Sequence, residues 1–152
     1  MSTLKEILSR PGARPQVIRD CEQIIEEEVA SKGLAGIAIK GAFAVVKAIK
    51  PGFIAEVIDS LLDDFADRLD PMYQAAKTKN EPITVHFNAH AGEAAEALLG
   101  ITDQRAQRAK NQVIKTAYEK LRPMAKKHTE AAIPRVGRMI AKHDAAAPAP
   151  TA

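Results

Sequence analysis

The sequence predicts an all-α fold, a compact bundle of six or seven helices. Apolar residues recur at spacings of three and four along most of the chain, which is the period of an amphipathic helix. Alanine is abundant, whereas the aromatic residues are limited to four phenylalanines and two tyrosines, without tryptophan. This composition favours closely packed helices over a sheet of bulky residues. Proline and glycine interrupt the periodic segments and so divide the 152 residues into elements.

Start signals mark the first two helices. Thr3 and Glu6 form a capping box, which predicts a short helix to about Ser9. A Pro-Gly pair ends it, and Pro15 is well placed at the first position of a longer helix, where its missing N–H costs nothing. That helix is expected to end at a cap near Gly33, and its apolar stripe includes Ile18, Cys21, Ile25 and Val29.

Residues 34–49 are apolar over most of the helix circumference, so we expect this segment to be the buried centre of the bundle. An edge of small residues, including Gly41 and Ala44, would let another helix approach closely. The alternative is a helix that lies on a membrane surface. The charged residues fall in one narrow wedge of the helix, at Lys40, Lys47 and Lys50.

Residues 53–69 predict an amphipathic helix that follows a Pro-Gly break. Pro71 is expected to start or kink a further short helix that ends near Lys79. Paired carboxylates act as acid and base when burial separates their pKa values. The acidic stripe of the 53–69 helix lies opposite its apolar face, so we expect it to be a solvated face and not a metal or acid–base site. This acidic stripe consists of Glu56, Asp59, Asp63, Asp67 and Asp70.

The second half of the chain is expected to begin with a loop at 81–90. Alternating apolar residues there suit a strand, but an isolated strand has no pairing partner. A helix at 89–99 stopped by Gly100 should follow, then a long helix from Thr102 or Asp103 to about Arg122, and a last helix to about His143 bent at Pro134. Residues 145–152 predict a disordered Ala/Pro tail, which leaves a single helical domain at 1–144.

Charge is segregated along the chain. Residues 1–102 carry a net charge of −4 and residues 103–152 a net charge of +7, for +3 overall. A stripe of basic side chains can bind the phosphates of nucleic acid or an anionic membrane, although a base-stacking platform is not expected beside a lone Tyr118. The alternative is a stripe that pairs with the acidic stripe or a second subunit, or is solvated. The candidate binding residues follow one another on one helix face: Arg105, Arg108, Lys115, Arg122 and Lys126.

No catalytic constellation is recognisable, so we expect neither an enzyme nor a bound cofactor. His86 and His90, with Glu93 one turn further on, have the spacing of a helical zinc site. The residues between the two histidines lack the glutamate that a metalloprotease helix carries, and we interpret them as surface histidines without a metal. Cys21 lies on an apolar stripe and is expected to be a buried, inert thiol.

The single cysteine precludes an intramolecular disulfide and favours a reducing compartment. The N-terminus lacks the basic and apolar regions of a signal peptide. The longest apolar stretch, residues 33–49, contains two lysines and falls short of the roughly 20 residues that a membrane span needs. We therefore expect a soluble, cytoplasmic protein without a transmembrane segment.

Three runs of sequence stand out: KPGFI at 50–54, ALLGITD at 97–103 and YEKLRPMAKKH at 118–128. Taken together, they resemble a family of small bacterial helical proteins that is defined only as a domain of unknown function. The resemblance covers nearly the whole chain, from Thr3 to His143. It implies a bacterial cytosolic protein with an all-α fold, and it implies no activity, substrate or binding residue.

The leading functional hypothesis is a protein-interaction or scaffold role without catalysis. One form of it is a homo-oligomer in which acidic and basic faces of different subunits meet. The alternative is binding of nucleic acid or an anionic membrane surface through the basic stripe. A small apolar ligand held between alanine-rich helices is the third possibility.

Overall fold

The computed structural model describes residues 2–31 and 36–147, and within these residues the chain forms seven helices and no strand. This confirms the predicted all-α fold. The helices are α1 (Leu4–Ser9), α2 (Arg14–Ala30), α3 (Gly36–Lys47), α4 (Phe53–Thr78), α5 (Ile83–Ala89), α6 (Ala91–Arg108) and α7 (Gln112–Ala146).

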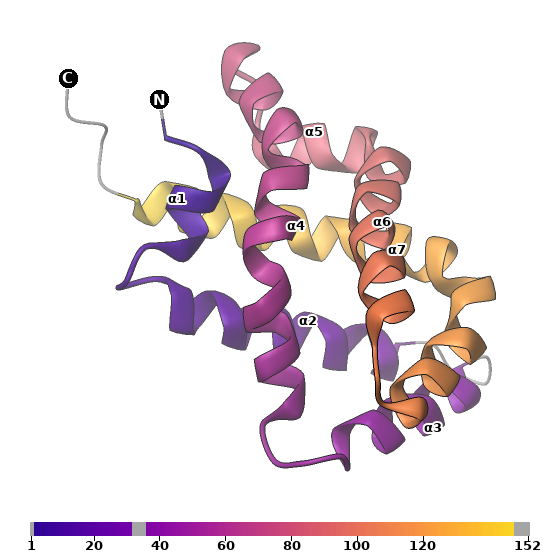
Figure 1. Cartoon of the computed structure of the whole chain (residues 1–152). Coiled ribbons are helices and arrows are strands. Elements are labelled where there is room, and N and C mark those ends of the chain that lie inside the picture. The colour runs from indigo at the N-terminus through magenta and orange to yellow at the C-terminus, as the bar shows by residue number, and fades with distance from the viewer. Residues whose placement is uncertain (1, 32–35, 148–152) are drawn as a thin grey trace.

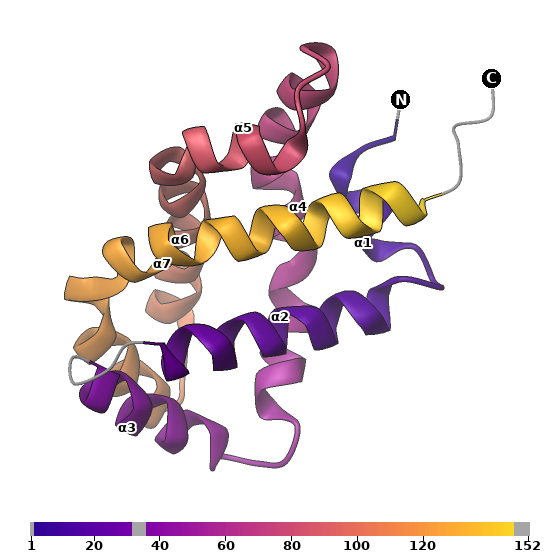
Figure 2. The same ribbon diagram turned by 180° about the vertical axis from the view of Figure 1, so that it is seen from behind.

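The longer helices form two crossed layers (Figure 1). α4 and α6 lie side by side in one layer, and α2 and the last part of α7 lie side by side in the other. α1 packs on α4, and α5 lies against the last part of α7 at one end of the molecule (Figure 2). At the opposite end, α3 lies beside the first part of α7 and also contacts α2 and α4.

The core fills the space between these layers, with α4 and α7 as its main contributors. Tyr73 of α4 and Ile133 and Ile140 of α7 are almost fully buried, as is Phe87 of α5. Burial of each such side chain stabilises the fold by about 1.5–3 kcal/mol relative to exposure. α1 and α2 close the core at the amino-terminal side with Leu4 and Val17.

The prediction that residues 34–49 form the buried centre is wrong. Among the side chains that the structure describes in α3, Ile39 is buried, whereas Ala44 and Val45 are exposed. The physical reason is position, because α3 lies at one end of the molecule and contacts α2, α4 and α7 from one side, so one face of the apolar helix stays open. The expected helix start at Leu34 and the cap near Gly33 lie outside the described residues.

The prolines divide the chain less than expected. Pro71 lies inside a continuous α4, and Pro123 and Pro134 lie inside a continuous α7. Each proline removes one backbone N–H, which favours a bend that tertiary packing can hold. The ribbon of α7 indeed changes direction between its first and last parts (Figure 2).

Two further boundaries differ from the expectation. The 81–90 segment forms α5 instead of a loop, with Ile83 and Phe87 on the core side one turn apart. The expected helix stop at Gly100 and the expected helix start at Thr102 are both absent, since α6 runs through them. The chain breaks later, at 109–111, where Asn111 caps α7 by accepting hydrogen bonds from the N–H groups of Val113 (2.8 Å) and Ile114 (3.4 Å).

The start signals are confirmed where the structure describes them. Thr3 Oγ1 accepts a hydrogen bond from Glu6 N at 3.1 Å, and Pro15 lies in the first turn of α2. Gly52 precedes α4 with a φ of 76°, a backbone conformation that favours glycine. At the other end, α7 extends to Ala146, and residues 148–152 of the expected tail lie outside the described residues. In the described part of the chain, no helix has the length and apolarity required to cross a membrane.

Candidate interaction surface

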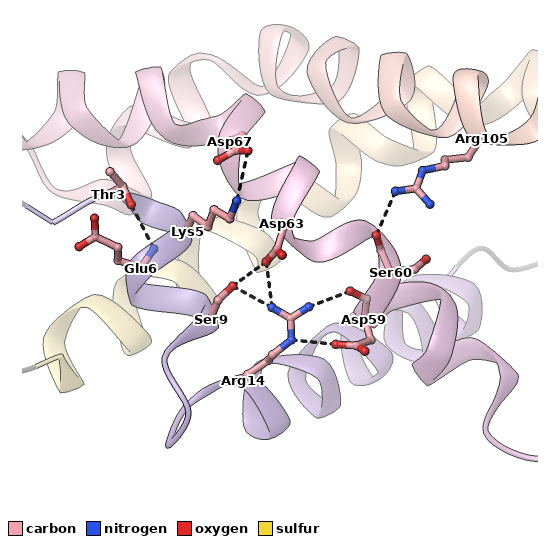
Figure 3. A network of polar contacts seen from close by, with 10 residues as sticks. All are labelled: Thr3, Lys5, Glu6, Ser9, Arg14, Asp59, Ser60, Asp63, Asp67 and Arg105. Atoms are coloured by element: carbon pink, nitrogen blue, oxygen red, sulfur yellow. Dashed lines mark hydrogen bonds and ion pairs between the residues drawn. The ribbon is translucent and has the colours of Figure 1, made fainter.

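The acidic stripe of α4 is occupied by cations of the same chain. Arg14, at the start of α2, donates from Nε to Asp59 Oδ1 at 2.7 Å and from Nη1 to Asp63 Oδ1 at 2.9 Å. Ser9 also donates to Asp63, as Figure 3 shows. The hydrogen bond from Arg14, with that from Ser9, holds the pKa of the Asp63 carboxyl below its usual range. The stripe is thus a docking face for α1 and α2.

The other members of the acidic stripe are also used. Asp67 lies 3.8 Å from Lys5, Asp70 accepts from the N–H of Leu4 at 2.8 Å, and Glu56 pairs with Lys50 at 2.8 Å. These carboxylates remain partly exposed, so the expectation of a solvated face is correct in part. Each of them thus has a partner within the same chain.

The basic stripe predicted on one helix is divided between two. Arg105 and Arg108 belong to the last turn of α6, whereas Lys115, Arg122 and Lys126 belong to α7. The break at 109–111 separates the two groups, because the chain turns there and α7 returns along α6. The five cations therefore do not form a single straight stripe.

Three of these five residues form ion pairs that tie helices together. Arg105 of α6 contacts Asp64 of α4 at 2.9 Å. Arg122 of α7 donates to both carboxylate oxygens of Asp103 on α6, at 2.8 and 3.1 Å. In addition, Lys126 contacts Glu96 at 2.8 Å. The three partners are acidic residues of the same chain, but none of them belongs to the acidic stripe, which was the expected partner within the chain.

A polar pocket of about 400 Å³ lies between α6 and α7 beside Arg122. Its Tyr118 donates a short hydrogen bond to Asp103 and contacts the Thr102 hydroxyl at 3.0 Å. Burial and the bond to Asp103 raise the pKa of Tyr118. The charged groups that line the pocket are Asp103 and Glu119 against Lys115 and Arg122, so they balance. This arrangement offers little net attraction to an anion.

The remaining two predicted residues are unpaired. The side chains of Arg108 and Lys115 make no ion pair or hydrogen bond with the residues that the structure describes, and the same holds for Lys110 and Lys120. Arg108 and Lys110 lie at the turn from α6 into α7, and Lys115 and Lys120 follow in the first three turns of α7. We call them the basic rim: Arg108, Lys110, Lys115 and Lys120.

Beside the basic rim, an open apolar groove of about 470 Å³ runs between α3 and the first turns of α7. Gly41, Ala42 and Val45 form its α3 wall. Its α7 wall consists of Gln112, Val113, Thr116, Ala117 and Lys120. Lys120 is the charged residue of this lining, so the groove joins the basic rim directly.

The groove is open to solvent. Val45 is 51% exposed and Val113 is 45% exposed, and both are among the most exposed large apolar side chains in the described residues. A Cβ added at Gly41 would meet no atom within 4 Å. Apolar side chains left open at a concave surface mark sites of interaction.

A family model described as a family of unknown function (DUF6918) matches residues 4–144. The chain belongs to this family. The match confirms the resemblance read from the sequence, and it extends from the first residue of α1 to within two residues of the end of α7. No curated protein and no solved structure matches the chain.

His86 and His90, which have the spacing of a helical zinc site, lie side by side, and each makes a contact within the protein. The rings of His86 and His90 stack with centroids 4.3 Å apart, and His90 Nδ1 lies 2.9 Å from the carbonyl oxygen of His86. His86 is buried, contrary to the interpretation of both as surface histidines, because α5 is a helix and turns His86 inward. Among the described residues, no group of three or more His, Cys, Asp or Glu side chains is arranged to hold a metal ion.

Cys21 is half-buried on α2 and packs against the core. Burial, with the charges of Asp20 and Glu22, raises the pKa of its thiol to about 12, which keeps the thiol protonated. The thiol is thus less buried than expected, and its raised pKa favours the low reactivity that the sequence predicts.

Sequence reasoning found the cations of the candidate surface but missed the groove. Arg108 and Lys115 were predicted, whereas neither Val45 nor Val113 was singled out. The signal for the groove was the small-residue edge of α3, which was interpreted as the seat of another helix of the same chain. The structure places no helix on the Gly41 side of that edge within the described residues.

Proposed function

We propose that this protein is a non-catalytic protein-binding module of the bacterial cytoplasm, and that its partner docks in the groove between α3 and α7. One observation carries the proposal, namely that Val45 and Val113 remain exposed on the two sides of an open apolar groove. Burial of such a groove by a partner is favourable at about 25 cal/mol per Å² of apolar surface.

The polar clusters of the chain support a role without catalysis. Asp103, Tyr118 and Arg122 satisfy one another, and Asp59 and Asp63 are held by Arg14. In each case the cluster joins two helices and leaves no nucleophile beside a free general base. The thiol of Cys21 is protonated and packed against the core.

The proposal is tested by placing a photoreactive amino acid at Val45 or Val113 in cells that express the protein naturally. The expected result is a cross-linked adduct with the same protein at both positions. The adduct partner is then purified, and its binding to the wild-type chain is compared with its binding to Val113→Glu. Binding should be lost in that variant, because a buried carboxylate in an apolar contact is strongly unfavourable.

Val85 provides the matched control, since it is 52% exposed on α5, which lies at the opposite end of the molecule from α3. The photoreactive residue at Val85 should give no such adduct, and Val85→Glu should bind the partner like the wild type. Equal cross-linking at all three positions, or none at the two groove positions, would refute the proposal.

A second candidate function is binding of nucleic acid or an anionic membrane surface through the basic rim. The observation that favours it is that Arg108 and Lys115 lack acidic partners in the described residues, unlike Arg105, Arg122 and Lys126. Gel-shift and vesicle-binding assays at low salt test it, with the double variant Arg108→Glu and Lys115→Glu against Lys79→Glu as control. Binding that survives the double variant, or is absent from the wild type, rules this candidate out.

A further inference from the structure

We propose that the occupant of the groove is an amphipathic helix of a partner protein whose apolar face is flanked by acidic residues. The inference rests on the proposed function and adds the chemistry of the partner. Two features support it, namely the shape of the groove and the charge of its lining.

The shape of the groove suits a helix. Its walls are two helices, and its floor is formed by small side chains at Ala42 and Ala117 with Gly41 at the edge. Small residues let a third helix approach to the 8–10 Å that separates packed helices. The other common docking mode, addition of a strand to an open sheet edge, needs a strand, and the described residues contain none.

A concave groove also favours a helix over a membrane. A bilayer surface is approached by apolar side chains that protrude from a convex face. Here Val45 and Val113 stand on facing walls, so the apolar surface between them is reached by side chains inserted from outside. A ridge of residues at spacings of three and four on the partner helix provides such side chains.

The described lining of the groove carries one charged side chain, and its charge is positive. This side chain is Lys120, which forms no ion pair with the described residues, and no acidic residue is among the described residues that line the groove. Lys115 and Glu119 both face the polar pocket on the α6 side of α7. A partner with glutamate or aspartate beside its apolar ridge would be attracted and oriented by Lys120.

A second copy of the chain could also present carboxylates to Lys120. Some of its acidic residues are paired internally, since Glu27 and Glu28 of α2 bind Arg135 and the acidic stripe of α4 binds Arg14, Lys5 and Lys50. Glu22, Glu93 and Glu119, however, form no ion pair with the described residues. The oligomeric state of the wild type therefore separates a second copy from an outside partner.

The test uses the full-length protein and three synthetic helical peptides with one shared leucine ridge at positions i, i+3, i+4 and i+7. The flanking residues are glutamate in the first peptide, glutamine in the second and lysine in the third. Binding is measured by fluorescence anisotropy at low and high salt. The glutamate peptide should bind about tenfold more tightly than the lysine peptide. Its advantage should shrink at 1 M salt, where the screening length falls to about 3 Å.

Two pairs of variants locate the binding. Gly41→Leu should abolish binding because it fills the groove, whereas Gly41→Ala adds a methyl group into open space and should leave binding intact. Lys120→Glu should weaken the glutamate peptide about twofold to fivefold more than Lys79→Glu, which changes a lysine at the far end of α4. Circular dichroism of each variant confirms that it remains folded.

The outcomes separate the inference from the proposed function. If the glutamine or lysine peptide binds as tightly as the glutamate peptide and Gly41→Leu blocks it, the acidic partner is refuted and the groove remains a protein-docking site. If no peptide binds, the inference is refuted, and the cross-linking at Val45 decides the proposed function separately. A dimer of the wild type that Gly41→Leu dissociates would assign the groove to a second copy. Binding of phosphatidylglycerol vesicles that Gly41→Leu abolishes, without peptide binding, would assign it to a membrane.

Discussion

The imidazole of His143 lies 2.7 Å from the carboxylate of Asp20, with both side chains nearly removed from solvent, and this contact fastens the last turns of α7 to α2. Gln16 donates to the other oxygen of Asp20 at 2.8 Å, and Lys142 approaches at 3.1 Å. The next residue, Asp144, accepts a hydrogen bond of 2.5 Å from Tyr73 on α4. Two successive residues of α7 thus connect it to both layers.

Asp20→Asn should destabilise the protein at neutral pH and reduce its sensitivity to acid. Burial acts to raise the pKa of Asp20, but the bonds from His143, Gln16 and Lys142 together outweigh it and lower the pKa below 3.8. A lowered carboxyl pKa adds stability above the unfolded-state value that is lost as the pH falls through the folded-state value. We expect a cost of about 1–3 kcal/mol at pH 7, with the wild type and the variant converging below about pH 3.8.

Urea denaturation at a series of pH values measures this effect. Asp67→Asn serves as control, because Asp67 is largely exposed and its contact with Lys5 is long at 3.8 Å. That control should change stability by about 0.5 kcal/mol or less. A constant difference between wild type and Asp20→Asn down to the lowest pH would contradict the role assigned to the carboxylate.

Arg14→Met should cost about 1–2 kcal/mol, because the half-exposed carboxylates of Asp59 and Asp63 lose their shared cation and Ser9 loses a donor. Arg14→Lys should recover little of this, since one ammonium group cannot reproduce a planar fork that also reaches the carbonyl oxygen of Asp59. Thermal and urea unfolding measure both variants. If Arg14→Lys is as stable as the wild type, a positive charge alone stabilises this contact, and the hydrogen-bond geometry in Figure 3 adds no stability.

The sequence allowed the helices to be placed wherever a local signal decides them. Thr3 caps α1, Pro15 starts α2 and Gly52 turns the chain into α4, all as predicted. Such signals act over a few residues and need no knowledge of the rest of the fold. The cap at Asn111 is also a local signal, and the capping preference of asparagine was available to find it.

The wrong predictions concern features that tertiary contacts determine, such as helix continuity at a proline and the position of a helix in the bundle. A proline costs about 3 kcal/mol inside a helix, yet packing of Tyr73 and Ile133 near Pro71 and Pro134 outweighs this cost and keeps α4 and α7 continuous. Periodicity also cannot tell whether an apolar helix is central or peripheral, as α3 illustrates. Three of the five predicted cations proved to be structural, because their acidic partners lie on helices that only the fold brings near.

Replacement of glycine by alanine should change the stability in opposite directions at Gly100 and Gly52. Gly100 lies inside α6 with no atom within 4 Å of an added Cβ, so Gly100→Ala should stabilise the protein by about 0.5–1 kcal/mol. Gly52 has a φ of 76°, and Gly52→Ala should therefore destabilise it by about 1 kcal/mol despite open space around it. Midpoints of urea unfolding measure both. Changes of the same sign would show that the backbone at Gly52 is not constrained as described.

Cys21 should be nearly unreactive in the folded protein. With its thiol pKa raised to about 12, only about one molecule in ten thousand carries the thiolate at pH 8. Ellman's reagent should label the native chain slowly and the urea-unfolded chain within seconds to minutes. Native labelling at the rate of a free thiol would show that Cys21 is more open than its packing against the core indicates.

Substitutions in the groove should leave the fold intact, because its exposed valines are proposed to serve binding of a partner and not the stability of the fold. Val113→Glu and Val45→Glu change exposed side chains and should alter the free energy of unfolding by about 0.5 kcal/mol or less. Ile133→Ala, at a fully buried position of the same α7, should cost about 2–5 kcal/mol because it leaves a cavity. Urea denaturation compares the three variants. A groove variant as damaging as Ile133→Ala would mean that the groove closes in solution and that its valines belong to the core.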